Sequence, residues 1–129
     1  MEATARLPKS VKEARRRPAM TAVRARGSDE FALLAAQAAT ASRMLKLLGN
    51  ESRLLILCSL AARGEMKVGH LVDTVGLSQS ALSQHLGLLR EEGLVAFRRE
   101  SQTLYYRVSD PRAARILKVL KDIYCGELA

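Results

Sequence analysis

The chain has 129 residues, of which 48% are hydrophobic, and a formal net charge of +8. A chain of this length buries a single small core. No uninterrupted apolar run approaches the roughly 20 residues of a membrane span, and the first residues lack the apolar centre of a secretory signal. We therefore expect a soluble, cytoplasmic protein with no membrane partner. Two widely separated cysteines, Cys58 and Cys125, suit a reducing compartment.

Most of the positive charge lies in residues 1–28, where eight Lys or Arg face two Glu, a net charge of +6. The rest of the chain holds thirteen basic residues against eleven acidic ones. Since the first segment shows no apolar periodicity, we expect a disordered basic N-terminal arm. Two interpretations stay open: an arm that contacts DNA phosphates, and a non-functional extension upstream of a start at Met20. The charge alone does not choose between them.

Residues 29–129 read as one domain that opens with a helix. Ser28 and Asp29 suit a helix cap, and apolar residues recur at three- and four-residue spacing until Gly49. A second helix is expected over 51–63. Its predicted apolar face is Leu54, Leu57, Cys58 and Ala61. A short third helix follows over about 67–75, and Gly76 suits the left-handed residue after its end.

A fourth helix is expected after Ser78, a strong N-cap, with Leu77 packing on Leu82 as a hydrophobic staple. Leu82, Leu86 and Leu89 form the predicted buried stripe. The opposite face carries Gln79, Ser80, Ser83, Gln84 and Gly87 in place of the Lys and Glu of a solvated surface. Two helices with a short turn between them are the layout of a helix-turn-helix. Because Gln pairs bidentately with adenine and Ser bonds to bases or phosphates, we expect Gln79, Ser80, Ser83 and Gln84 to bind DNA.

The stretches "LVAFRRE" and "TLYYRV" alternate and predict a β-hairpin joined around Glu100-Ser101-Gln102. A hairpin directly after a recognition helix is a wing, so Arg98, Arg99 and Gln102 are candidate contacts to phosphates or the minor groove. Asp110 and Pro111 open a last helix. This helix and the first one carry more apolar surface than so small a core needs, which indicates a dimer interface. The predicted fold is mainly α with a β-hairpin wing: a homodimeric winged helix-turn-helix of five helices.

From Leu48 to Val108, "LGNESRLLILCSL", "VGHLVDTVGLSQSALSQHLGLLREEGLV" and "RRESQTLYYRV" resemble the ArsR/SmtB family of bacterial winged-helix repressors. The resemblance implies a homodimer that binds double-stranded operator DNA at an inverted repeat. It also implies release from that operator when an inducer binds or modifies the protein.

A metal inducer is disfavoured by the residues at the family's metal sites. Where many relatives carry Cys-x-Cys in the third helix, "EMKVGHL" has Lys67 and Gly69, and the last helix contains no His. His70 and His85 fall on separate helices with no partner at ligand spacing. We therefore predict neither a metal site nor a cofactor. No nucleophile paired with a base and no phosphate-binding glycine loop is present, so we expect no enzyme.

Cys58 and Cys125 permit two interpretations from local chemistry: small buried apolar residues, or reactive thiols. Their placement, in the second helix and near the end of the last one, resembles the BigR/SqrR subgroup, which senses reactive sulfur through a bridge between two thiols. The resemblance thus implies a repressor that releases DNA when persulfide or polysulfide bridges Cys58 and Cys125. The alternatives are a repressor that responds to another oxidant, an electrophile or a metal, and a winged-helix protein-interaction module with structural cysteines.

Overall fold

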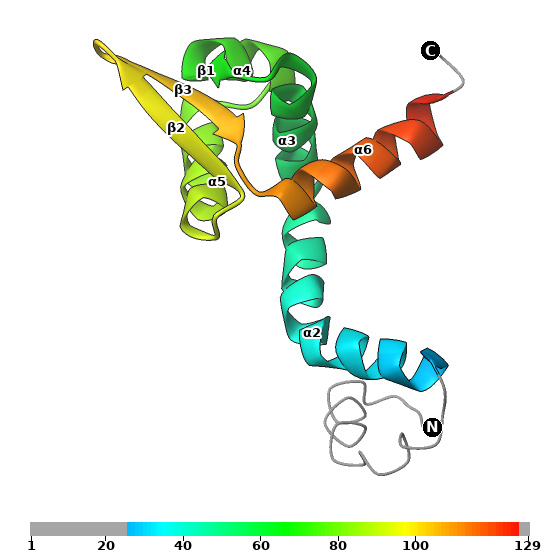
Figure 1. Ribbon diagram of the computed structural model, residues 1–129. Helices are drawn as coiled ribbons and strands as arrows, with labels where there is room; N and C mark the ends of the chain where they lie inside the picture. The colour runs from blue at the N-terminus through cyan, green and yellow to red at the C-terminus, as the bar shows by residue number, and fades with distance from the viewer. Residues whose placement is uncertain (1–25, 127–129) are drawn as a thin grey trace. The chain divides into compact units, whose positions relative to one another are not determined.

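A computed structural model describes residues 26–126 of the chain (Figure 1). The elements in these residues are α2 (Arg26–Leu48), α3 (Glu51–Arg63), β1 (Met66–Lys67), α4 (Val68–Val75), α5 (Gln79–Glu91), β2 (Val95–Glu100), β3 (Thr103–Val108) and α6 (Pro111–Cys125). The predicted mainly helical fold with a hairpin wing is confirmed, with five helices among the described residues. The predicted basic arm lies outside the described residues as far as residue 25.

The chain divides into two units, residues 1–45 and 46–129. The described part of the first unit belongs to α2, which begins at Arg26. The helix therefore begins before Ser28 and Asp29, the residues that the sequence placed at its start. Phe31, Leu33 and Leu34 are exposed, at 56%, 70% and 62%.

In the second unit, α3 begins at a capped turn. Asn50 Oδ1 accepts a hydrogen bond from Arg53 N at 3.0 Å, and Arg53 Nε donates to the Leu47 carbonyl oxygen at 2.8 Å. The buried residues of α3 are Ile56, Leu57 and Leu60. Of the predicted apolar face, Leu57 is buried and Leu54 half-buried, whereas Cys58 and Ala61 are exposed. Since α3 is apolar around most of its circumference, periodicity does not fix which side turns inward.

The sheet has three antiparallel strands in the order β1-β3-β2. Strands β2 and β3 form the predicted hairpin, and Ser101, with φ of 61°, begins its two-residue loop. The sequence did not predict β1, which pairs Met66 with Tyr106 and Lys67 with Tyr105. Lys67 therefore belongs to a strand, and α4 begins one residue later than expected.

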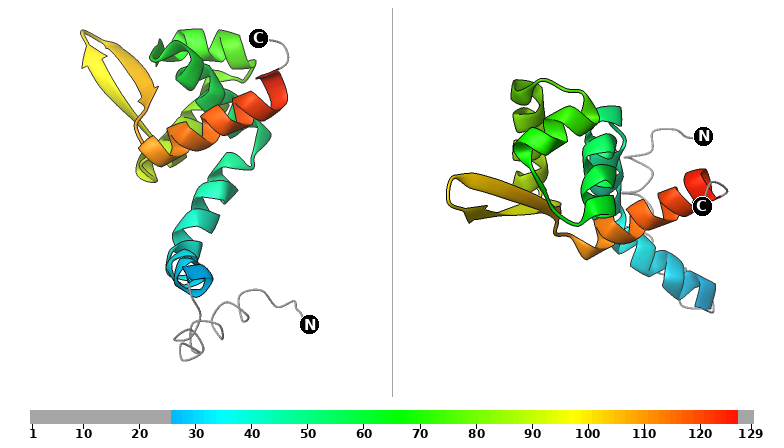
Figure 2. Two further views of the ribbon diagram at one scale, coloured as in Figure 1. Left: turned by 45° about the vertical axis from the view of Figure 1, so that its right-hand side comes forward. Right: turned by 90° about the horizontal axis from the view of Figure 1, so that it is seen from above.

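One core joins these elements. Its largest fully buried side chains are Ile56, Leu57, Leu60, Leu71, Leu82, Leu86, Leu89 and Leu94. Helix α6 starts at the predicted cap, where Asp110 Oδ1 accepts from Arg112 N at 2.8 Å. It contacts α3 and buries Ala113 and Leu117 from its first half (Figure 2). The core thus sets α5, the hairpin and α6 around α3 and α4.

Candidate DNA-binding surface and cysteine pair

Helix α5 exposes all four residues that the sequence predicts to read bases: Gln79, Ser80, Ser83 and Gln84. The predicted stripe on its other side is buried and consists of Leu82, Leu86 and Leu89. His85 is half-buried beside this stripe. A rigid, packed helix therefore presents a row of amide and hydroxyl groups to solvent.

The turn between α4 and α5 fixes where α5 begins. Gly76 is left-handed, with φ of 75°, and its N–H donates to the Val72 carbonyl oxygen at 3.0 Å. Ser78 Oγ accepts from Ala81 N at 3.0 Å, which satisfies one of the free N–H groups at the start of the helix. Both features match the sequence prediction, and α4 and α5 form a helix-turn-helix.

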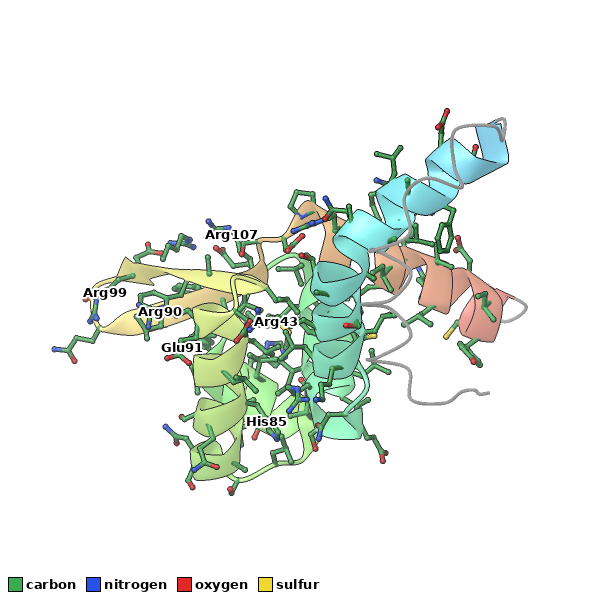
Figure 3. All side chains as sticks on the ribbon, turned by 90° about the horizontal axis from the view of Figure 1, so that it is seen from below. Arg43, His85, Arg90, Glu91, Arg99 and Arg107 are labelled. Atoms are coloured by element: carbon green, nitrogen blue, oxygen red, sulfur yellow. The ribbon has the colours of Figure 1, made fainter. Side chains whose placement is uncertain are left out.

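The two predicted wing arginines lie on opposite faces of the hairpin, because successive residues of a strand alternate between faces. Arg99 lies on the same face as Phe97. The ring of Phe97 contacts Arg90 of α5, whose guanidinium carbon lies 4.5 Å from the ring centre. Arg98 shares the outer face with Arg107. Figure 3 shows Arg90 and Arg107 on opposite sides of the hairpin.

Arg98 is held in place by its neighbours. Its Nε and Nη2 donate to the two carboxylate oxygens of Glu65, at 2.9 and 3.1 Å, and its Nη1 donates to Glu100 at 2.9 Å. Its guanidinium carbon lies 4.4 Å from the centre of the Tyr105 ring. The hydrogen bonds from Arg98 lower the pKa of Glu65, and those to Glu65 and Glu100 raise the pKa of Arg98. The structure therefore does not bring Arg98 and Arg99 together.

At the tip of the wing, Arg99 and Gln102 are exposed. No ion pair or side-chain hydrogen bond involves Arg99 within residues 26–126. Its side chain projects from the hairpin near the tip (Figure 3). Arg99 is thus a cation available to a ligand.

Sequence reasoning missed a group of polar residues beside the start of α5. Lys67, His70 and Asp73 line a shallow hollow together with Gln79. Arg63 Nη1 lies 3.3 Å from His70 Nε2 at this place. The closeness of these residues to Gln79 depends on how α4 packs on α5, and no local pattern in the sequence reports that packing.

Cys58 and Cys125 are free thiols, and both are exposed. Partial burial raises the pKa of the Cys58 thiol, and the charge of Cys125 raises it further. The second cause places the two sulfur atoms within electrostatic reach of each other, although 66 residues of sequence separate them. Cys58 lies on α3 and Cys125 ends α6, and these two helices contact each other.

Two kinds of site are absent from residues 26–126. No three His, Cys, Asp or Glu side chains gather there closely enough to hold a metal ion. No helix in this part of the chain has the length and apolar character needed to cross a membrane.

The helix-turn-helix, the exposed polar face of α5 and the hairpin beside it define a winged helix-turn-helix DNA-binding protein. Comparison with known proteins agrees. Residues 50–96 match the family described as "Bacterial regulatory protein, arsR family". The HTH-type transcriptional regulator YgaV of Escherichia coli is 40% identical over 96 residues, which cover 74% of this chain and 97% of that protein.

Solved structures give the same relationship. The transcriptional repressor BigR from Xylella fastidiosa matches with a TM-score of 0.65 at 38% identity, over 69% of this chain and 90% of that chain. Reduced HlyU from Vibrio cholerae matches with a TM-score of 0.66 at 45% identity, over 69% and 93%. The chain belongs to the ArsR family of bacterial transcriptional regulators. Members of this family bind DNA and are not enzymes.

Proposed function

We propose that the protein is a homodimeric repressor that binds an inverted-repeat operator and releases it when reactive sulfur bridges Cys58 and Cys125. The observation that supports the proposal is that two exposed, free thiols lie on the contacting helices α3 and α6, in a fold whose α5 presents a polar face for DNA. The proposed base contacts are Gln79, Ser80, Ser83 and Gln84. Since operator DNA lies in the cytoplasm of a bacterium, the protein acts there.

Dimer formation is supported by apolar side chains left uncovered on α6. Val119, Ile123 and Tyr124 are 54%, 66% and 77% exposed. A contiguous apolar surface on one helix marks an interaction site. A second copy fits this surface because an inverted repeat requires a two-fold protein with two recognition helices.

The proposed switch needs only chemistry that two thiols and a polysulfide supply. One thiolate attacks a terminal sulfur–sulfur bond of the polysulfide, forms a bond to sulfur and expels HS⁻. The second thiolate then attacks the attached chain at its far end and expels a second HS⁻. The product is a Cys58–Cys125 link that retains the intervening sulfur atoms. Both thiols are oxidised, and sulfane sulfur is reduced to the two HS⁻ ions.

The link would act on DNA affinity through α3 and α6. Cys58 lies in α3, which packs against α4, and α4 in turn packs against α5; Cys125 is the last residue of α6. A covalent link between these helices alters the support of α5 and the surface proposed for dimerisation. A change of about 1–3 kcal/mol in DNA affinity is enough, since allosteric couplings usually fall in this range.

The operator is obtained by selecting duplexes from a random-sequence pool with the reduced protein. Binding of that duplex is then measured after treatment with polysulfide, peroxide, Zn(II) or reductant. The proposal predicts release by polysulfide and restoration by reductant. Release by peroxide or Zn(II), with none by polysulfide, would support the other inducers that the sequence left open. Equal binding of selected and random duplexes at every salt concentration would favour the protein-interaction module.

Recognition of DNA bases by α5 is tested separately. Gln79→Ala or Gln84→Ala should each cost about 1–3 kcal/mol on the selected operator and relax preference at one position of each half-site. Equal losses on operator and random duplex would refute base contacts by these two residues.

A further inference from the structure

The Arg98–Glu65 pair crosses the sheet. Glu65 directly precedes β1, and the strand order β1-β3-β2 puts β1 and β2 on opposite sides of β3. Tyr105 of β3 pairs with Arg98 on one side and with Lys67 on the other. The side chain of Arg98 therefore passes over Tyr105 to reach Glu65. It ties the edge strand of the wing to the segment that joins α3 to β1.

A second contact holds the wing on its other face. The guanidinium carbon of Arg90, on α5, lies 4.5 Å from the centre of the Phe97 ring. Phe97 in turn packs on Tyr106, with ring centres 5.4 Å apart. Since β2 carries both Phe97 and Arg98, the base of the wing is fixed to α5 on one face and to the α3–β1 segment on the other.

The charges around Arg98 do not favour a phosphate there. Arg98 lies within ion-pair distance of two carboxylates, Glu65 and Glu100, and Arg107 also acts on Glu65, so the positive charge of Arg98 is already compensated. A phosphate that approached Arg98 would meet both carboxylates. Arg99, on the opposite face and nearer the tip, has no such neighbour within the described part of the chain.

We propose that Arg98 is a positioning residue that fixes the angle between the wing and α5, and that Arg99 makes the wing's phosphate contact. The inference rests on the proposed DNA-binding function and assigns different roles to two adjacent arginines. Because wing and α5 must reach the duplex together, a loosened wing weakens binding to every sequence without removing a phosphate contact.

Salt dependence separates the two roles. Each phosphate contact adds about 0.9 to the slope of log affinity against log salt concentration, so Arg99→Ala should lower this slope by about one per protomer. Arg98→Ala should weaken binding by about threefold to tenfold, the scale of lost ion pairs and a cation–π contact, with the slope unchanged. Circular dichroism and thermal unfolding are the controls that test whether each variant is folded.

Two further variants distinguish a positioning role of Arg98 from a phosphate contact, because the two roles predict different DNA affinities. Lysine binds phosphate but lacks the planar fork that a carboxylate accepts, so Arg98→Lys should weaken binding as Arg98→Ala does. Glu65→Ala should also weaken binding, because it removes the same tie. The matched control is Glu51→Ala, which removes an exposed carboxylate at the start of α3. If Arg98 instead contacts phosphate, Glu65→Ala frees it and strengthens binding beyond the control.

A reduced salt slope in Arg98→Ala, wild-type affinity in Arg98→Lys, or tighter binding by Glu65→Ala than by Glu51→Ala overturns the inference. These results leave the proposed function intact, since the wild type still binds its selected duplex. Failure of the wild type to bind any duplex in a salt-dependent manner would refute the proposed function itself.

Discussion

Gly87 occupies the middle of α5, where the fold does not require a glycine. A methyl group at this position would meet no protein atom within 4 Å, and its φ is not positive. A glycine in a helix costs roughly 0.5–1 kcal/mol relative to alanine. We expect that this cost is retained because the DNA backbone approaches α5 at Gly87. Gly87→Ala should therefore raise the free energy of unfolding by about that amount, measured in urea, while weakening operator binding.

Gly76 provides the contrast. Its φ of 75° is one that side chains rarely adopt, so Gly76→Ala should lower the free energy of unfolding by about 1 kcal/mol. Comparison of the two variants separates a glycine required by the turn from one required by a ligand. Undiminished operator affinity in a stabilised Gly87→Ala protein would mean that the duplex does not approach α5 there.

The reactivity of Cys58 should depend on Cys125. Burial first, and then the charge of Cys125, raise the pKa of the Cys58 thiol. Only the thiolate reacts, so alkylation of Cys58 should be slow at neutral pH and accelerate as the pH passes through the raised pKa. Cys125→Ser removes the second cause, so the pH–rate profile of Cys58 should move to lower pH. Iodoacetamide labelling read by mass spectrometry measures the profile, and an unchanged profile would contradict the closeness of the two sulfurs.

Among the elements, α5 begins at Ser78, a residue that stabilises the helix and also lies where we expect DNA to bind. Ser78 Oγ caps the helix by accepting from Ala81 N. Ser78→Ala should cost about 1 kcal/mol of stability. Ser78→Asp should keep the cap and interact favourably with the helix dipole, yet place a negative charge where DNA phosphates approach. The aspartate variant should thus unfold like wild type in urea but bind the operator more weakly, and equal binding would remove this helix terminus from the interface.

Local signals predicted the elements whose ends are set by neighbouring residues. The caps at Ser78 and Asp110 and the left-handed Gly76 all lie where the sequence placed them, because each depends on a few adjacent residues. Strand β1 escaped prediction because two residues are too few to show alternation. It exists only because β3 supplies its hydrogen-bonding partners.

The candidate site was predictable only in part for the same physical reason. The exposed face of α5 follows from helical spacing around its buried leucines, which the sequence displays. The engagement of Arg98 by Glu65 joins residues 33 positions apart and depends on the sheet order, which no local pattern contains. The exposure of Cys58 likewise depends on which side of α3, a helix that is apolar around most of its circumference, turns inward.

For the whole molecule, the proposed dimerisation through α6 makes a prediction about assembly. Ile123 is 66% exposed on α6, so Ile123→Asp should yield monomers in light-scattering measurements by placing charge in an apolar interface. Arg115→Asp, an exposed change on the same helix, is the control and should remain dimeric. A dimeric, fully active Ile123→Asp protein would place the interface elsewhere.

The same dimer predicts the form of the operator. Two recognition helices related by a two-fold axis lie about 34 Å apart, one turn of DNA, so half-site centres should be about 10 bp apart. Lengthening the spacer of the selected operator by half a turn should reduce affinity to that of a single half-site. Undiminished binding to the lengthened duplex would contradict a rigid two-fold dimer with a fixed spacing between its recognition helices.

The proposed switch requires Cys58 and Cys125 to act together in releasing DNA. The most direct measurement is operator binding by wild type, Cys58→Ser and Cys125→Ser before and after polysulfide, with mass spectrometry of each treated sample. We predict that all three proteins bind when reduced, that only the wild type releases DNA, and that it then carries an intrachain Cys58–Cys125 link with added sulfur. Release by either single variant, or by wild type whose thiols are modified but not linked, would contradict the claim.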